Sequence, residues 1–305
     1  MITRPQNPSA FVLLFSLKGS IITAIWRKVL FTVLISSVVV ATHGTLYHYK
    51  VVLTATPFTL WGLTLAICLG FRNTVAYQRF WEARTLWGEL SIITRNLTRQ
   101  ILTLLPMAAD HERRQLLDLL IGFGYTLKDF LRRTGPSEEL SRLLDEPARE
   151  AIAGKQSPPS ALLHQLGERT INLARQSGAS DMVQVHLDEQ LTRMNYVLGG
   201  CERIKNTPIP YPYILMLHRI VHLYCFLLPF CLVDSIGWFT PFAVCVLAYT
   251  FFGLDALGDQ IADPFDTQPN DLPLDAMCRG NEIAVLEMLG EQAPAAAQPV
   301  NGVLL

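Results

Sequence analysis

VVLTATPFTLWGLTLAICLGFRNTVAYQRFWEARTLWGELSIITRNLTR, residues 51–99, decides the fold of this chain. Its first part, Val51–Phe71, carries no charged residue over about the length that a helix needs to cross a bilayer. The second part, which begins at Arg72, still has a helical pattern but is amphipathic and basic. No strong helix breaker separates the two parts, and one helix of this length would run roughly 70 Å. We therefore predict one helix that crosses the membrane and continues into a water-exposed domain.

The composition indicates a membrane protein with a large polar part. The chain of 305 residues is 50% hydrophobic and 17% charged, and its mean hydropathy is +0.28. A chain of this composition is too apolar to be an ordinary soluble protein and too charged to consist of membrane spans alone. The net charge of −1 gives no reason to expect nucleic acid as a partner.

Four apolar runs are candidates for membrane-spanning helices. They are Val29–Tyr49, Val51–Phe71, Ile220–Val233 and Ser235–Leu254. Lys and Arg gather before the first run and just after the second, and they are absent from the loop at 234–240. The positive-inside rule therefore predicts a multi-pass protein of the inner membrane, with both termini and the middle of the chain in the cytoplasm.

The whole chain is predicted to be all-α, with five segments of different character. These are 1–71 (an interfacial helix and the first two spans), 72–206 (a cytosolic helical domain), 207–256 (a proline-rich link and the last two spans), 257–290 (a cytosolic acidic segment and a short helix) and 291–305 (a disordered tail). Helices of the cytosolic domain are expected at 73–104, 110–134, 137–153, 160–177 and 180–205. We expect the prolines of 207–213 to prevent regular helix, residues 255–280 to be irregular, and a helix at 281–290.

One face of the second span changes character along its length. Leu63, Ile67 and Phe71 repeat every four residues and share a helix face, which Thr74 and Gln78 continue into the polar half. A face that passes from bulky apolar to polar suits a pore-lining helix with a hydrophobic constriction, which gates by dewetting. Packing of this face against a neighbouring helix is the equal alternative.

The candidate metal ligands form only weak patterns. His218 and His222 are four residues apart, a spacing that can chelate a metal, but no HExxH motif or second histidine pair accompanies them. We interpret them as interfacial histidines. The acidic residues Asp263, Asp266 and Asp271 are weak candidates for Ca²⁺, because the EF-hand order is absent; a solvated acidic loop is the favoured interpretation.

Charged and aromatic residues alternate just after the second span. They are Arg79, Phe80, Trp81, Glu82, Arg84, Trp87 and Glu89. Aromatic side chains among charges at helical spacing are common in subunit interfaces, so we expect a cyclic homo-oligomer.

Three separated motifs resemble the bestrophin family, in its bacterial branch. They are GFRNTVAYQRFWEARTLWG (70–88), TPIPYPYILMLHR (207–219) and DPFDTQPNDLPLD (263–275), and the resemblance covers roughly residues 10–290. It implies a homopentameric ion channel in which each subunit contributes four membrane-spanning helices and a large cytosolic helical part around one central pore. It also implies that Leu63, Ile67 and Phe71 match the hydrophobic neck of that family.

One departure concerns calcium. Animal bestrophins follow the Pro-Phe motif with a dense acidic run that forms a calcium clasp, whereas here Asp266 is followed by Thr267, Gln268, Pro269 and Asn270. We therefore expect no calcium gating and no cofactor.

The sequence contains no P-loop, no GxSxG and no dinucleotide fingerprint, so we expect no enzyme. The favoured function is a homopentameric passive channel for small monovalent ions, chloride by family resemblance, with cation conduction possible in the bacterial branch. Its partners would be other copies of itself, membrane lipid and the permeant ions. The first alternative is a membrane-anchored scaffold or receptor with a partner-binding cytosolic domain; a metalloenzyme that uses His218 and His222 is third.

Overall fold

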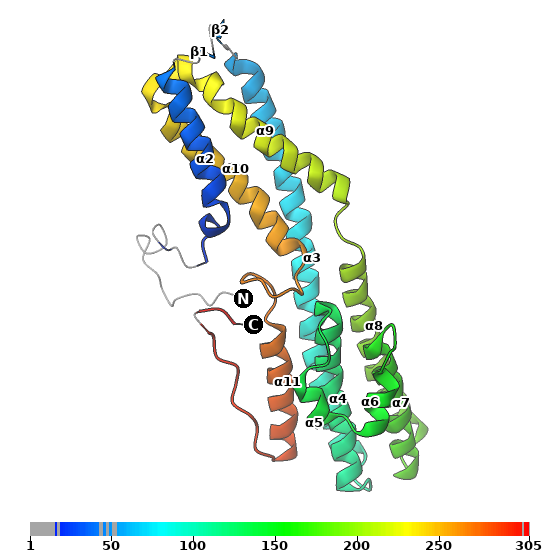
Figure 1. Ribbon diagram of the computed structural model, residues 1–305. Helices are drawn as coiled ribbons and strands as arrows, with labels where there is room; N and C mark the ends of the chain where they lie inside the picture. Colours follow the sequence, from blue (N-terminus) through cyan, green and yellow to red (C-terminus); the bar gives the residue numbers. More distant parts are fainter. Residues whose placement is uncertain are drawn as a thin grey trace. The chain divides into compact units, whose positions relative to one another are not determined.

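The computed structural model describes residues 16, 19–42, 45–46, 49–50, 54–300 and 302–304. The described part is helical except for one pair of two-residue strands and connecting segments (Figure 1). The elements are α2 (Ile22–Ala41), β1 (Thr45–Leu46), β2 (Tyr49–Lys50), α3 (Ala55–Leu104), α4 (Asp110–Arg132), α5 (Glu138–Leu143), α6 (Glu146–Ile152), α7 (Pro158–Gln176), α8 (Asp181–Asn206), α9 (Tyr211–Ile236), the 3₁₀ turn η1 (Gly237–Phe239), α10 (Thr240–Ala262) and α11 (Leu274–Leu289).

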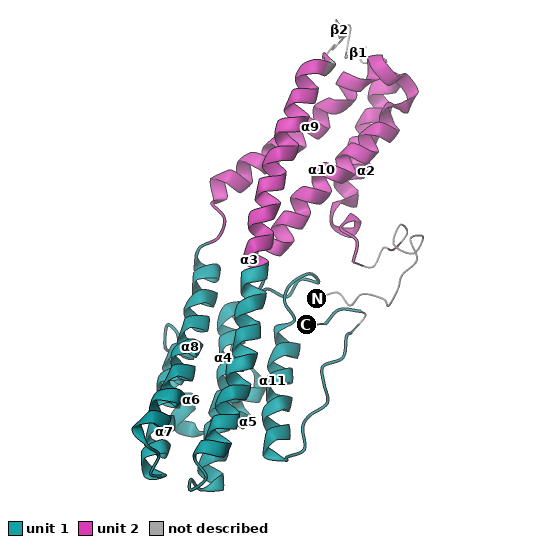
Figure 2. Ribbon diagram, turned by 180° about the vertical axis from the view of Figure 1, so that it is seen from behind, with its two compact units in different colours: residues 1–3, 81–207, 264–305 teal, residues 4–80, 208–263 magenta. Residues whose placement is uncertain are grey.

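The chain forms two compact units (Figure 2). The apolar unit consists of the described residues within Arg4–Phe80 together with Pro208–Asp263, and the polar unit consists mainly of Trp81–Thr207 and Pro264–Leu305. Helix α3 contributes to both units as one continuous element, as the unbroken helical pattern of its sequence predicts. Compactness does not locate the membrane surface, so the division at 71 and 206 remains a prediction.

The apolar unit is built from α2, α3, α9 and α10. Helix α10 packs against α2 and α9, and α2 also packs against α9. Their shared core includes Ile25, Leu65, Leu69, Val221 and Val244, at least one from each helix. Large apolar side chains also cover the outer faces of these helices. An apolar exterior of this extent is typical of helices surrounded by lipid rather than water.

Three helical stretches of the described chain are long and apolar enough to cross a membrane: Ile22–Ala41, Thr56–Leu104 and Tyr211–Ala262. The third contains two helices, α9 and α10, which are separated by the short turn η1. Gly237 begins this turn with a φ of 52°, a left-handed conformation that glycine adopts at little cost. The chain can reverse there because the α-helical hydrogen-bond pattern is interrupted.

The predicted first span, Val29–Tyr49, is wrong at its C-terminal end, and its helix begins earlier than Val29. Helix α2 begins at Ile22 and therefore includes Arg27 and Lys28, and it ends at Ala41, while Tyr49 lies in β2. Long basic side chains are tolerated at the end of a span because their apolar stems stay in contact with the helix while the charge reaches the interface. Residues 8–15, 17 and 18 of the expected interfacial stretch 8–28 lie outside the described residues.

Prolines begin helices where we expected them to prevent helix. Helix α9 starts at Tyr211, with Pro212 in its first turn, and α7 starts at Pro158. A helix does not use the N–H groups of its first turn, so proline is tolerated there. The extended link is therefore shorter than the predicted 207–213.

The polar unit is organised around α4, which packs against α5, α7, α8 and α11. The predicted single helix at 137–153 is two helices, because Asp145 accepts a hydrogen bond from the Ala148 amide and begins α6. The region 255–280 is not irregular throughout, since α10 continues to Ala262 and α11 already begins at Leu274.

Two adjacent glycines of α8 provide a matched test of how this helix packs against α3. A Cβ atom on Gly200 would lie 2.8 Å from Leu86 Cδ1, whereas a Cβ on Gly199 would meet nothing within 4 Å. Alanine in place of glycine stabilises a helix by about 1 kcal/mol, but overpacking a buried contact costs about 1–3 kcal/mol. We expect Gly199→Ala to raise the thermal unfolding midpoint and Gly200→Ala to lower it. Equal shifts for the two variants would contradict this packing of α8 on Leu86.

Candidate functional site

The face of α3 singled out in the sequence is exposed in the folded chain. The side chains of Leu63, Ile67 and Phe71 are 59%, 51% and 68% exposed, although all three are large and apolar. Thr74 and Gln78, which continue the same face, are also exposed. We call this exposed row the α3 stripe, and it does not pack into the core of its own chain. In the membrane it must lie against lipid, another subunit or a pore.

The opposite face of α3 holds this helix in the apolar unit. Leu65, Leu69, Arg72 and Ala76 succeed one another along this face and all are buried. Nearer the start of α3, Gly62 lets the helix approach Tyr224, since a Cβ atom there would lie 2.6 Å from the tyrosine oxygen. The close approach of α3 to α9 therefore depends on a residue without a side chain.

Arg72 is a fully buried cation in this face, one residue after the end of the apolar part of the α3 stripe. Its side chain is 0% exposed, and it pairs with two carboxylates of α10. Nη1 donates to Asp255 Oδ1 at 2.6 Å, and Nη2 donates to Asp259. A buried guanidinium requires such partners, because an unpaired charge in a low-dielectric interior is very costly.

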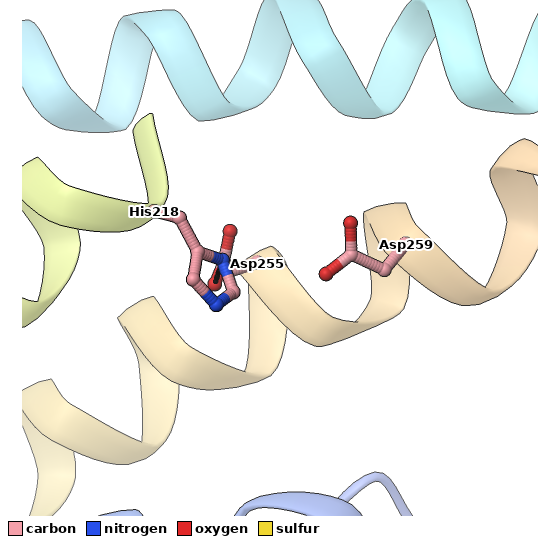
Figure 3. Close-up of side chains that lie close together, drawn as sticks. All are labelled: His218, Asp255 and Asp259. Carbon is pink, nitrogen blue, oxygen red and sulfur yellow. Dashed lines mark ion pairs between the residues drawn. The ribbon is translucent and has the colours of Figure 1, made fainter. Parts of the chain in front are cut away.

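Asp255 is shared between Arg72 and His218 of α9. The second oxygen of Asp255 lies 2.7 Å from His218 Nδ1, and the Asp255 side chain is 1% exposed. Figure 3 shows the imidazole of His218 against the Asp255 carboxylate, with Asp259 about one turn further along α10. The interpretation of His218 as an interfacial residue stays a prediction, but this histidine also has a buried acidic partner. Its acidic partner lies downstream in another helix, where spacing along one helix cannot reveal it.

We call Arg72, His218, Asp255 and Asp259 the Arg72 cluster. His218, Asp255 and Asp259 each have one possible metal-ligand atom that lies within 4.8 Å of those of the other two residues. Such a group has the spacing of a metal site, but Arg72 already provides the cation between its two carboxylates. The geometry is that of an ion-pair cluster linking α3, α9 and α10.

The helices fit closely around the Arg72 cluster. A Cβ atom on Gly258 would lie 2.3 Å from Asn73 Oδ1, so a larger residue there would force the Asn73 side chain to move, and it would lie 3.5 Å from Arg72 Cζ, which is an ordinary contact. Asn73 Nδ2 donates to the Leu254 carbonyl at 3.1 Å, and Arg79 Nε donates to the Ala262 carbonyl at 3.0 Å. These bonds continue the attachment of α3 to α10 beyond the cluster.

The acidic segment that we expected to be a solvated loop is only partly exposed. Asp255 and Asp271 are buried, and the backbone N–H of Gln268 donates to Asp271 at 2.7 Å. Asp263 and Asp266 are exposed. The structure does not place Asp263, Asp266 and Asp271 in a group with metal-ligand spacing within the described part of the chain.

Asp275, which belongs to the same acidic run, pairs with two cations of α4. Lys128 Nζ donates to it at 2.8 Å and Arg132 Nη1 at 2.5 Å. Burial alone would raise the pKa of Asp275, but these two cations outweigh it and lower the pKa. Burial would likewise lower the pKa of Lys128, and the bond to Asp275 raises it. Both groups therefore stay charged and hold α11 against α4.

The charged and aromatic residues after the span are mostly used within the chain. Trp87, expected in a subunit interface, is fully buried in its own chain. Glu82 pairs with Arg203 and Glu89 with Arg193, both on α8. Trp81 is exposed on its own chain, so part of its side chain can contact another subunit.

The polar unit also contains a cavity of about 790 Å³. Its lining includes the apolar Leu144 and Ile152 and the cations Arg133, Lys155 and Lys205. Pockets of this size commonly hold small molecules.

The two carboxylates of the Arg72 cluster differ in burial, which provides a matched test. Asp255→Asn leaves Arg72 with one partner, and breaking a buried ion pair costs about 3–5 kcal/mol. Asp259 is 45% exposed, so Asp259→Asn removes a screened pair worth about 1 kcal/mol or less. We expect a much lower unfolding midpoint for Asp255→Asn than for Asp259→Asn in detergent-purified protein. Indistinguishable midpoints would show that the buried pair does not hold α3.

Comparison with known proteins places these features in a family. Residues 1–287 match the family described as Bacterial/Fungal Bestrophin protein. A voltage-dependent anion channel-forming protein of Mesorhizobium japonicum is 40% identical over 295 residues, which cover 96% of this chain and 94% of the relative. A protein of the same description from Escherichia coli K12 is 38% identical over 300 residues, 98% of each chain.

Solved structures agree with this assignment. The crystal structure of a bacterial bestrophin homologue from Klebsiella pneumoniae is similar to this chain with a TM-score of 0.83 and 40% sequence identity. The similarity covers 88% of this chain and 99% of the Klebsiella chain. Fold and sequence thus agree over nearly the whole length, and the chain belongs to the bacterial bestrophin family.

Proposed function

We propose that this protein is a homopentameric, passive channel for small monovalent ions in the bacterial inner membrane. The observation that carries this proposal is the exposed α3 stripe, which changes from Leu63, Ile67 and Phe71 to Thr74 and Gln78. It lies on a helix long and apolar enough to cross the membrane. A surface that only faces lipid has no need to become polar along one line, whereas the lining of an ion path does.

A pore must be built from several copies, because one chain supplies one such stripe. Five copies of α3 around an axis, as the family resemblance implies, would place Leu63, Ile67 and Phe71 in three successive apolar rings. Apolar rings offer no ligand to replace the hydration shell of an ion, so a narrow ring excludes water and ions together. The three rings would form the neck of the channel.

In this arrangement α2, α3, α9 and α10 each cross the membrane once. Helices α9 and α10 have 26 and 23 residues, enough for one crossing each. An even number of crossings places both termini on one side, and the distribution of basic residues in the sequence assigns that side to the cytoplasm.

Anions are the expected permeant ions. The relatives from Mesorhizobium japonicum and Escherichia coli are described as anion channel-forming proteins. In this chain Arg72, which directly follows the proposed neck, is buried on the face opposite the α3 stripe and pairs with two carboxylates. The proposed neck therefore carries no charge of its own, and the sign of the permeant ion is open to direct measurement.

The test of the proposal is the current carried by purified protein in a planar bilayer under a salt gradient. We expect single-channel currents whose reversal potential lies towards that of chloride. A reversal potential towards that of the cation would correct the ion selectivity and leave the channel function intact. No current from monodisperse, correctly assembled protein would favour the membrane-anchored scaffold or receptor, for which the cavity lined by Arg133 and Lys155 offers a binding site.

The neck itself is tested by shortening its three side chains together. A triple variant that carries Leu63→Ala, Ile67→Ala and Phe71→Ala would have three wider rings. Wider rings lower the free-energy barrier to ion passage, and each decrease of about 1.4 kcal/mol in that barrier corresponds to a tenfold higher rate. We expect a higher conductance or open probability and a particle mass, corrected for detergent, of five subunits.

A matched control lies on α2, where Leu30, Leu34 and Val38 have the same spacing and similar exposure, 50%, 56% and 62%. We expect the corresponding triple alanine variant to conduct as the wild type does, because these side chains would face lipid. A neck variant that assembles but conducts no better than this control would exclude the proposed neck. A neck variant that fails to assemble would instead identify the α3 stripe as a packing surface.

A further inference from the structure

We propose that Arg72 is a positioning residue for the neck and that His218 is the proton-binding group that acts on the neck through it. The inference rests on the proposed channel function and concerns the regulation of the same site. It is carried by the Arg72 cluster, in which a buried cation of α3 shares a buried carboxylate with a partly exposed histidine of α9.

Arg72 is placed to fix the orientation of the neck. Arg72 comes directly after Phe71, and the side chains of successive helical residues point in directions about 100° apart. Fixing the direction of Arg72 therefore also fixes that of Phe71. Its guanidinium bonds two carboxylates one turn apart on α10. A planar fork held at two points resists both rotation and sliding of the helix that carries it. The directions of Phe71 and of Ile67, one turn earlier, therefore depend on the bonds of Arg72.

The geometry also places His218 to form an ion pair with Asp255 when the imidazole is protonated. His218 Nδ1 lies 2.7 Å from Asp255 Oδ2, and within the described residues neither atom has a hydrogen-bond partner. Because a carboxylate can only accept hydrogen bonds, it favours a hydrogen on the nearby Nδ1 and leaves Nε2 for a further proton. The His218 side chain is 38% exposed, so its own chain does not cover the ring completely.

A proton on Nε2 changes the charge balance of the cluster. With neutral His218 there is one guanidinium for two carboxylates, and with imidazolium the cluster becomes neutral. The other charged or titratable groups nearby are His222 of α9, whose Nδ1–H donates to the His218 carbonyl at 2.7 Å, and Lys28 of α2. Lys28 Nζ lies 5.8 Å from the centre of the Phe252 ring.

The added charge competes with Arg72 for Asp255. Asp255 Oδ1 accepts a hydrogen bond from Arg72, and its Oδ2 lies 2.7 Å from His218 Nδ1, so attraction to an imidazolium would weaken the hold of the carboxylate on Arg72. Arg72 then depends more on Asp259, which is 45% exposed and more easily screened. Protonation of His218 thus loosens the attachment of α3 to α10 immediately beside the neck.

The experiment measures open probability in symmetrical salt between about pH 5 and 8, the range in which histidine side chains change charge. We expect the wild type to change by about fivefold or more across this range, the lower end of typical coupling between two sites. In His218→Asn the side-chain amide can still donate to Asp255 but cannot become a cation. This variant is expected to keep the behaviour of the wild type at high pH throughout the range.

The matched control is His222→Asn, which removes the neighbouring histidine of the same helix without removing a partner of Asp255. It should retain the pH dependence of the wild type.

Arg72→Lys keeps the positive charge but replaces the forked guanidinium by a single point of attachment. We therefore expect its open probability to differ from that of the wild type and to depend less on pH. This variant tests the route through Arg72 independently of His218→Asn.

The outcomes separate this inference from the function on which it rests. A wild type that never conducts contradicts the proposed channel. A wild type that conducts equally at all pH values overturns the role of His218 while the channel function stands. The inference is also overturned if His218→Asn or Arg72→Lys keeps the full pH dependence. Stoichiometric metal that is bound by the wild type and lost in His218→Asn would overturn it too, because a metal would then hold the carboxylates.

Discussion

The attachment of Arg72 to α10 is the interaction on which the apolar unit most depends. A charge buried in this way is tolerated only because Asp255 and Asp259 neutralise it. Leucine at position 72 would fill the same face of α3 and would need no carboxylate partners. The ion pairs instead define one rotation of α3 relative to α10, and this rotation leaves the α3 stripe exposed. The exposure of the stripe is thus a consequence of the charge buried behind it.

Exposure by itself does not distinguish a pore face from a lipid face. Helix α2 exposes Leu30, Leu34 and Val38 about as fully as α3 exposes its stripe. The difference lies further along each helix. Helix α2 ends at Ala41, whereas α3 continues with the polar Thr74 on the same line as the apolar residues of the stripe. A channel needs both an apolar exterior towards lipid and a water path within, and α3 is the helix whose sequence makes that transition.

The sequence predicts the helices and the stripe well because both depend on local periodicity, but it predicts distant partners and helix ends poorly. Arg72 and Asp255 are 183 residues apart, and neither residue indicates its partner. The local pattern around Trp87 shows that a face is apolar but not that the chain itself covers it. Pro158 lies in the first turn of a helix, where its missing N–H costs nothing. The acidic run before α11 has a solvated pattern, yet distant cations neutralise Asp275.

The uninterrupted length of α3 restricts how this protein can change in evolution. Its 50 residues carry the α3 stripe, the buried Arg72 and the residues that pack in the polar unit. Because the helix is continuous, the directions of all these side chains are fixed relative to one another. Inserting or deleting a single residue within it would turn everything beyond that point by about 100° and separate these features. Sequence length should therefore vary among relatives in the connections between the other helices, while α3 changes by substitution alone.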